Sequence, residues 1–193
     1  QNRTLAEKIA SRLDQLNMER RTIESLHLES AFAQVNAIGS EFPQAIIVHE
    51  VNWHPGVIGL VASRLCEQFR KPALVIAFDG DVGKGSGRSV RGVDLGAIIT
   101  GARQAGLIEA GGGHPMAAGF TIKFDRLSKF REFIEGKILK MVRKDDAAFF
   151  ELDAILDLGG VNSELVENFE KVGPFGSGNP RPRFGFSRLK VIR

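Results

Sequence analysis

Two glycine-rich stretches and one strand-to-helix junction in this sequence carry side chains that can bind an anion. The first stretch is a run of three glycines, Gly111, Gly112 and Gly113, followed by His114. Consecutive glycines let the backbone approach a ligand closely, and successive backbone N–H groups can form a nest that binds an anion. His114 can donate a hydrogen bond to a phosphate oxygen or stack on a base. The glycines alone leave open a second interpretation, a tight turn into a strand with no role for His114.

The second stretch, 83–89, places Lys84, Ser86, Arg88 and Ser89 among further glycines. A nucleotide-binding P-loop needs four residues between its first glycine and the Gly-Lys pair, and Ser or Thr after the lysine. Here the preceding glycine is too close to the lysine, and glycine follows it, so we exclude this mode of nucleoside triphosphate binding. A guanidinium is a planar fork that suits a phosphate, and hydroxyl groups add hydrogen bonds. The same residues are equally compatible with the solvated tip of a hairpin.

The junction, 53–59, joins a predicted buried strand to a predicted helix. A helix N-terminus presents unpaired N–H groups and a partial positive charge, which together bind anions. His54 lies immediately before this helix, and Pro55 suits its first turn. The alternative is a helix-capping turn in which His54 only fills surface or core.

Residue types that would cleave a bond or hold a metal are missing from these patterns. The four histidines are scattered, without the spacing of a helical metal site or a cluster of Asp with His; they are His27, His49, His54 and His114. Cys66 lies on a predicted apolar helix, so we interpret it as a small buried residue and not a nucleophile. We therefore expect no catalytic or metal-binding residue in this chain.

Hydrophobic spacing predicts the elements that would position these segments. Apolar residues near helical spacing, uninterrupted by Gly or Pro, predict one long helix up to about Asn36. Strands are predicted at 45–49, 73–78 and 118–124, helices at 56–69, 95–102 and 127–141, and a turn or hairpin at 79–87 leading into 88–90. Asp94 can cap the second of these helices. The alternation of strand and helix indicates an α/β fold, with a mixed β-sheet flanked by helices.

The end of the chain differs in composition from the middle. Strand patterns at 149–158 and 184–192 flank a short helix, capped by Asn162 or Ser163, and a Pro/Gly-rich stretch at 173–182. The remaining length is too short to close a barrel or sandwich, so we expect the sequence to stop inside a domain. The predicted parts are a long connector helix (1–40), an α/β domain (41–144), and a linker with the start of a β-rich domain (145–193).

Composition limits the class of protein. The net charge is only +3, but eight acids and no Lys or Arg lie within 145–170, and six basic residues and no acid lie within 171–193. This asymmetry is compatible with ordinary surface charge as well as with an anionic partner. No apolar stretch approaches a membrane span, and the start of the chain lacks a signal-peptide core. We therefore predict no membrane association and a cytoplasmic location, and the single cysteine excludes an intrachain disulfide.

Taken together, the motifs resemble the DHH-associated domain of the DHH phosphodiesterase superfamily. The segments that carry the resemblance are, in chain order, Trp53–Gly59, Gly85–Ser89, Gly111–His114 with Ala117–Gly119, and Pro174–Pro180. The glycine-His segment is shared across the superfamily, whereas the other segments in this order look like the RecJ family. The last segment is similar to the one that opens the RecJ OB-fold domain, and the long first helix is similar to the RecJ connector. Arg181 departs from the family, which often has an acid after the Asn-Pro pair.

This resemblance implies part of an exonuclease that degrades single-stranded DNA from 5′ to 3′ in bacterial recombination and repair. In that family a DHH domain holds two Mn²⁺ or Mg²⁺ ions, and its motifs are not found here, so we expect this chain to bind the strand and to be inactive alone. Single-stranded DNA is the implied partner, with single-stranded-DNA-binding protein and recombination helicases as partner proteins. The implied contacts are Ser86, Arg88 and Gly111 to His114, with Ser89, His54 and Lys84 in addition.

Two other functions stay open on the residues. One is the substrate-binding domain of a related phosphodiesterase that acts on short oligonucleotides or cyclic dinucleotides. The other is a non-catalytic nucleic-acid-binding or interaction module, like the domain appended to alanyl-tRNA synthetase.

Overall fold

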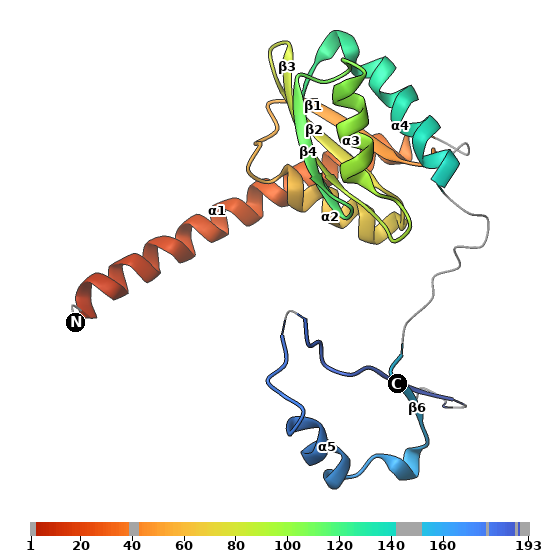
Figure 1. Cartoon of the computed structure of the whole chain (residues 1–193). Helices are drawn as coiled ribbons and strands as arrows, with labels where there is room; N and C mark the ends of the chain where they lie inside the picture. Colours follow the sequence, from red (N-terminus) through yellow and green to blue (C-terminus); the bar gives the residue numbers. More distant parts are fainter. Residues whose placement is uncertain (1–2, 39–42, 142–151, 177, 188, 190–193) are drawn as a thin grey trace. The chain divides into compact units, whose positions relative to one another are not determined.

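The structure is a computed structural model that describes residues 3–38, 43–141, 152–176, 178–187 and 189. It consists of two compact units, residues 1–144 and 145–193, which are considered separately below (Figure 1). No helix in the described ranges is long and apolar enough to cross a membrane.

The first unit is built on a five-stranded mixed sheet, in the order β1-β2-β3-β5-β4. The strands are β1 Ile46–Val51, β2 Ala73–Asp79, β3 Val82–Arg88, β4 Ala110–His114 and β5 Ala117–Lys123. β1 and β2 are parallel because helix α2 (Ile58–Phe69) connects them, whereas the other neighbours are antiparallel. This arrangement confirms the predicted mixed sheet flanked by helices.

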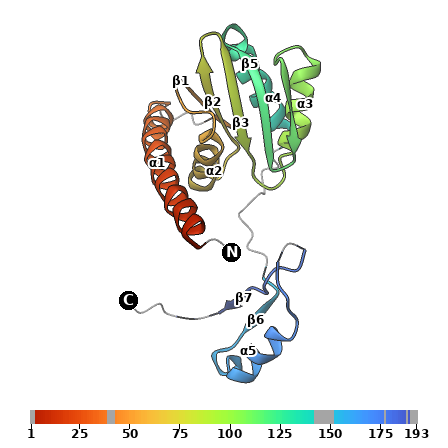
Figure 2. The same ribbon diagram turned by 90° about the vertical axis from the view of Figure 1, so that its left-hand side faces the viewer.

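Helices cover both faces of the sheet (Figure 2). α1 (Arg3–Asn36) and α2 pack on one face, and α3 (Leu95–Gln104) and α4 (Leu127–Met141) pack on the other, where a short 3-10 turn, Phe124–Arg126, precedes α4. The predicted long first helix is confirmed, and it ends at the predicted residue. Only its C-terminal part packs, because residues 3–19 are all exposed while Ala31 and Val35 are buried.

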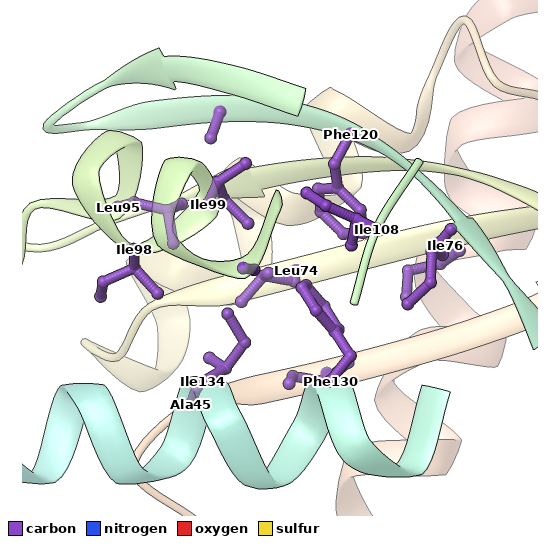
Figure 3. Packing of buried hydrophobic residues seen from close by; sticks show 14 of the residues in the cluster. Ala45, Leu74, Ile76, Leu95, Ile98, Ile99, Ile108, Phe120, Phe130 and Ile134 are labelled. Carbon is purple, nitrogen blue, oxygen red and sulfur yellow. The ribbon is translucent and has the colours of Figure 1, made fainter. Parts of the chain in front are cut away.

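Each face of the sheet has its own hydrophobic core. The core under α3 and α4 joins rings and branched side chains from the sheet and both helices (Figure 3); it includes Leu74, Ile76, Phe120, Ile99, Phe130 and Ile134. The core under α1 and α2 includes Val48, Val75, Trp53, Val61, Leu65 and Ala31. Asp94 begins α3 as predicted, since its carboxylate accepts a hydrogen bond from the N–H of Ala97 at 2.9 Å.

The glycine-rich segments differ from the predictions in one respect. The hairpin predicted for 79–87 is present, but only Gly80 and Asp81 form its turn, because Asp79 ends β2 and residues 82–87 belong to the central strand β3. We also predicted a loop for Gly111–His114, which is instead the edge strand β4, joined to β5 by the two residues Pro115 and Met116. Glycine is depleted in strands because it has no side chain to pack, and here neighbouring residues supply that packing.

The glycines of β3 leave room for large side chains underneath the strand. A Cβ atom at Gly83 would clash with Ile76 and Phe78, one at Gly85 with Phe120, and one at Gly87 with Leu95. These three glycines therefore all face the core under α3 and α4. The alternate residues of β3 face the side of the sheet on which α2 packs.

The second unit contains β6 (Ala154–Leu156), a 3-10 turn (Leu158–Gly160), α5 (Ser163–Glu170) and β7 (Phe184–Phe186), with β6 and β7 parallel. The side chain of Asn162 accepts a hydrogen bond from the N–H of Leu165 and caps α5, one of the two caps predicted. The predicted strands 149–158 and 184–192 extend partly outside the described residues. None of the described residues of this unit is buried.

Candidate nucleic-acid interface

Strand register assembles most of the predicted binding residues on one face of the sheet. Directly opposed residues in antiparallel strands project to the same face. Three rows therefore cross β3, β5 and β4: Arg88–Ala117–His114, Ser86–Gly119–Gly112 and Lys84–Thr121–Ala110. We call these nine residues the shelf. Adjacent strands are about 4.8 Å apart, so Arg88 and His114 stand roughly 10 Å apart on the same face.

A hollow of about 560 Å³ lies over the shelf beside the start of α2. Its lining combines residues from the three strands with one from the loop before α2 and the first residue of that helix; they are Pro55, Ile58, Lys84, Gly85, Ser86, Ala110, Gly111, Gly119, Phe120 and Thr121. Next to this lining, Gly112 leaves the shelf open, because a Cβ there would meet nothing within 4 Å. A Cβ at Gly119 would meet only the backbone oxygen of Gly85, at 3.9 Å. A flat group can therefore reach the backbone of the shelf.

Arg88 and Ser86 lie together beside the first turn of α2. The Arg88 guanidinium donates to the carbonyl of Gly87 at 2.9 Å and to the hydroxyl of Ser86 at 3.4 Å. A Cβ at Gly59 would lie 3.1 Å from Ser86 Oγ and 3.3 Å from Arg88 Nη2, so glycine there lets α2 approach both side chains. No carboxylate of the described residues forms an ion pair with Arg88. The guanidinium therefore keeps donors for an external anion.

The start of α2 adds further donors to the same region. The first amides of a helix have no acceptor inside the helix, and Val57, at the N-cap position, has no side-chain capping bond. Within the described ranges, the N–H groups of Ile58 and Gly59 have no hydrogen bond to an acceptor outside the helix. Together with the positive end of the helix dipole, these amides favour an anion near Arg88.

Lys84 is the second cation of the shelf. Its ammonium group donates to the hydroxyl of Thr121 at 3.0 Å, and the side chain is exposed. At the neighbouring edge, Glu109 pairs with Arg126 at 3.3 Å and with Lys123 at 3.9 Å. The rows of the shelf themselves contain basic and neutral residues but no acid. Its electrostatic potential therefore favours an anion.

Two of the predicted side-chain contacts, Ser89 and His54, lie away from the shelf. Ser89 is buried, and its hydroxyl donates to the carbonyl of Val93 at 2.8 Å, so it supports the turn after β3. His54 is exposed in the loop before α2, where its Nδ1 accepts the N–H of Gly56 at 3.1 Å. It does not line the hollow, although Pro55 next to it does.

The glycine-His segment has a different geometry from the predicted nest. A nest needs successive N–H groups that converge on one point, whereas in a strand successive groups point to opposite sides. Of the three glycines, only Gly112 lies on the shelf, with His114 at the end of the strand. Gly111 faces the core, where a Cβ would clash with Ile108, Ile99 and Phe120. The anion nest predicted for this segment is therefore wrong, while its position beside β5 brings Gly112 and His114 into the rows of Ser86 and Arg88.

Sequence reasoning missed several residues of the hollow. Gly119 and Thr121 belong to β5, whose apolar residues alternate with small or polar ones. That alternation was available in the sequence and places these residues on the face opposite to Phe120. Ile58, which lines the hollow, and Gly59, which lies against Ser86 and Arg88, carry no signal beyond their place at the start of a helix.

Metal-binding groups are not assembled in this region. No group of three or more His, Cys, Asp or Glu residues that could hold a metal ion occurs in the described ranges. Burial raises the pKa of the Cys66 thiol, with a further increase from Glu67 and a smaller decrease from Arg88. A thiol with a raised pKa is a poor nucleophile, so the structure gives Cys66 no sign of a reactive role.

Comparisons with known proteins agree with the motif resemblance. Residues 43–140 match the DHHA1 domain family, and residues 152–193 match the RecJ OB domain. The chain is 34% identical over 183 residues to the single-stranded-DNA-specific exonuclease RecJ of Bacillus subtilis, covering 92% of this chain and 22% of that protein. RecJ of Haemophilus influenzae is 30% identical and is matched over 93% of this chain and 32% of its own length.

A solved structure is also similar over most of the chain. RecJ of Thermus thermophilus in complex with Mn²⁺ has a TM-score of 0.79 and 28% identity, covering 94% of this chain and 26% of that one. The chain thus spans about a fifth to a third of the length of these relatives. Since the DHHA1 match covers half of the sequence, and a RecJ OB domain follows it, the chain belongs to the DHHA1 domain family and has RecJ proteins as homologues.

Proposed function

We propose that this chain is the strand-binding part of a metal-dependent exonuclease that degrades single-stranded DNA from 5′ to 3′ in recombination and repair. The observation that carries the proposal is the register of β3, β5 and β4, which aligns Arg88, Ser86 and Lys84 over a floor of small residues. The RecJ homologues support the same substrate, since they are single-stranded-DNA-specific exonucleases.

The spacing of the three β3 side chains suits a stretched single strand. Alternate residues of a strand are about 6.7 Å apart, at about 3.3 Å per residue. That step is roughly twice the rise per nucleotide of duplex DNA, so it fits an extended backbone better than a stacked helix. Arg88 with Ser86 and the start of α2 would hold one phosphate, and Lys84 would contact a later one.

The floor of the shelf favours binding without sequence preference. Gly112, Gly119 and Ala117 offer backbone and methyl surface but no side-chain groups that read base edges. Phosphate contacts position a nucleic acid without carrying sequence information. An exonuclease that moves along a strand needs this kind of contact, and His114 at the end of the first row could add stacking or a hydrogen bond.

The same proposal assigns the chemistry to another part of the protein. The residues described here do not fit a divalent metal site, whereas RecJ structures have been solved with Mn²⁺ and with Mg²⁺. In the proposal a DHH domain holds such ions and this chain alone does not hydrolyse DNA. Residues 1–40 would form the connector, 41–144 the substrate-binding domain and 145–193 the start of the OB domain. Single-stranded-DNA-binding protein and recombination helicases would be partners in the cytoplasm.

Binding of fluorescent oligothymidylate, followed by anisotropy at several salt concentrations, tests the proposal. Arg88→Ala should weaken binding at least about tenfold, because a charge-assisted hydrogen bond contributes about 1.5–3 kcal/mol. The slope of log K against log salt should also fall by about 0.7, the value for one phosphate contact on a single strand. Arg103→Ala is the matched control, an exposed arginine on α3 across the sheet.

Two results would overturn the proposal. One is equal binding by the Arg88 and Arg103 variants, which would remove the shelf from the interface. The other is release of nucleotides by the purified chain in Mn²⁺ or Mg²⁺, which would show that the chain holds its own catalytic centre.

A further inference from the structure

Two histidines fix the loop that precedes α2. The N–H of His54 donates to Nε2 of His27 at 2.8 Å, and the N–H of Gly56 donates to Nδ1 of His54 at 3.1 Å. His27 belongs to α1, so the first bond joins the long helix to this loop. The buried Trp53 also contacts His27, with the ring centroids 5.8 Å apart.

This loop continues directly into the first turn of α2, beside which Ser86 and Arg88 lie. The N–H of Val57 donates to the carbonyl of His54 at 3.1 Å, so the position of His54 sets that of the first turn of α2. Pro55 and Ile58 line the hollow. One residue further, Gly59 lies against Ser86 and Arg88, and a Cβ there would be only 3.1 Å from Ser86 Oγ and 3.3 Å from Arg88 Nη2. A shift of the loop would therefore move the helix start relative to the shelf.

We propose that His27 is a positioning residue for this site: its neutral imidazole holds the loop before α2, and its protonation loosens the loop and weakens DNA binding. The proposal rests on the proposed function, because the effect is read out through binding of a single strand. It adds a residue on α1, far from the shelf in sequence, and a dependence on pH that the phosphate contacts alone do not produce.

The chemistry of imidazole gives the direction of the effect. Nε2 accepts a hydrogen bond only in the neutral ring, since both nitrogens of the protonated ring are donors. Burial lowers the pKa of His27, and repulsion from His54 lowers it further, so the accepting form prevails at neutral pH. The titratable group that acts on His27 is His54 on the loop; one turn earlier on α1, Glu24 is paired with Arg20. Acidification therefore removes the acceptor of the bond from the N–H of His54.

The test measures binding of the 193-residue chain to oligothymidylate with a 5′-hydroxyl end, between pH 7.5 and 5.5. Phosphodiesters do not titrate in this range, so the probe stays constant. His27→Gln keeps an acceptor oxygen near the Nε2 position but does not titrate, and His27→Leu removes the acceptor. His49→Gln is the control, because His49 is a second half-buried histidine with a lowered pKa but lies on the α3 and α4 face.

We expect wild type to bind about two- to tenfold more weakly than His27→Gln at pH 5.5, the range for loss of one hydrogen bond. At pH 7.5 the two should bind equally, while His27→Leu should be weaker at every pH. His49→Gln should follow wild type throughout. A constant ratio of wild type to His27→Gln across the range would overturn the inference and leave the proposed function intact. Absence of binding by wild type at every pH would instead overturn the proposed function.

Discussion

Replacement of Gly85 by alanine should destabilise the first unit, although Gly85 is a small residue in the centre of a sheet. A Cβ at this position would lie within 2.6 Å of three ring atoms of Phe120. The nearest ring atom lies only 2.2 Å from that Cβ, so ring and methyl must separate by about 1.2 Å to reach 3.4 Å, the near limit of ordinary van der Waals contact. The ring cannot simply retreat, because it packs on the buried Phe130 with the centroids 5.0 Å apart.

Overpacking of this kind costs about 1–3 kcal/mol, which exceeds the roughly 0.5–1 kcal/mol that alanine gains over glycine in a strand. Urea unfolding followed by fluorescence of Trp53, the single tryptophan, measures the difference. Gly112→Ala is the control, since a Cβ there meets nothing within 4 Å, and its stability should stay within about 0.5 kcal/mol of wild type. Equal unfolding free energies for the two variants would refute the packing argument.

The same Gly85→Ala substitution in a Phe120→Leu variant tests whether the ring of Phe120 causes the loss of stability. In Phe120→Leu the ring is absent, so Gly85→Ala should cost less there, with a coupling energy of about 0.5–3 kcal/mol between the contacting residues. The two glycine variants should also separate stability from binding. Gly112→Ala places a methyl group on the shelf and should weaken DNA binding without lowering the unfolding free energy.

Three further measurements test other parts of the structure. Burial is the main cause of the lowered pKa of both His27 and His49, so the unfolded chain binds protons at higher pH, and the free energy of unfolding should fall as pH decreases below about 6.5. Urea unfolding of the variant with both His27→Gln and His49→Gln should show a weaker fall. Parallel curves of unfolding free energy against pH for the variant and wild type would contradict this. Asp94→Ala should cost about 1 kcal/mol through loss of the α3 cap, whereas Asp94→Asn should remain near wild type in the same assay, and equal losses would exclude capping. Amide hydrogen exchange should be fast in α5 and slow in β2, because none of the described residues of the second unit is buried; equal protection would refute this reading.

The sequence predicted the elements whose own side chains determine them. The spacing of Leu127, Phe130, Ile134 and Ile138 specifies one buried face, and the structure confirms α4 with these residues buried. The buried strand at 73–78 and the cap at Asp94 were predicted for equally local reasons. In each case the residues that form the element also make its main contacts.

The strands that carry the candidate site could not be predicted in this way. β3 has glycine at every position that faces the core, so its stability as a strand comes from side chains elsewhere in the chain, such as the ring of Phe120. This also explains the error over Ser89. In a loop, the Ser89 side chain could lie beside those of Ser86 and Arg88. Successive side chains of a strand point to opposite faces, however, and Ser89 directly follows β3. Its side chain is therefore buried, and its hydroxyl donates to the carbonyl of Val93.

Because the N-terminal part of α1 is long and exposed, a small rotation of the helix near the site would become a large displacement at its first turn. From Ala31, which is buried, to Arg3, the axis extends about 42 Å at 1.5 Å per residue, and residues 3–19 are all exposed (Figure 1). A rotation of about 5° around the buried end would displace Arg3 by roughly 4 Å over that length. The position of a spectroscopic label on the first turn of α1 would therefore change measurably when the contact between His27 and the loop before α2 rearranges.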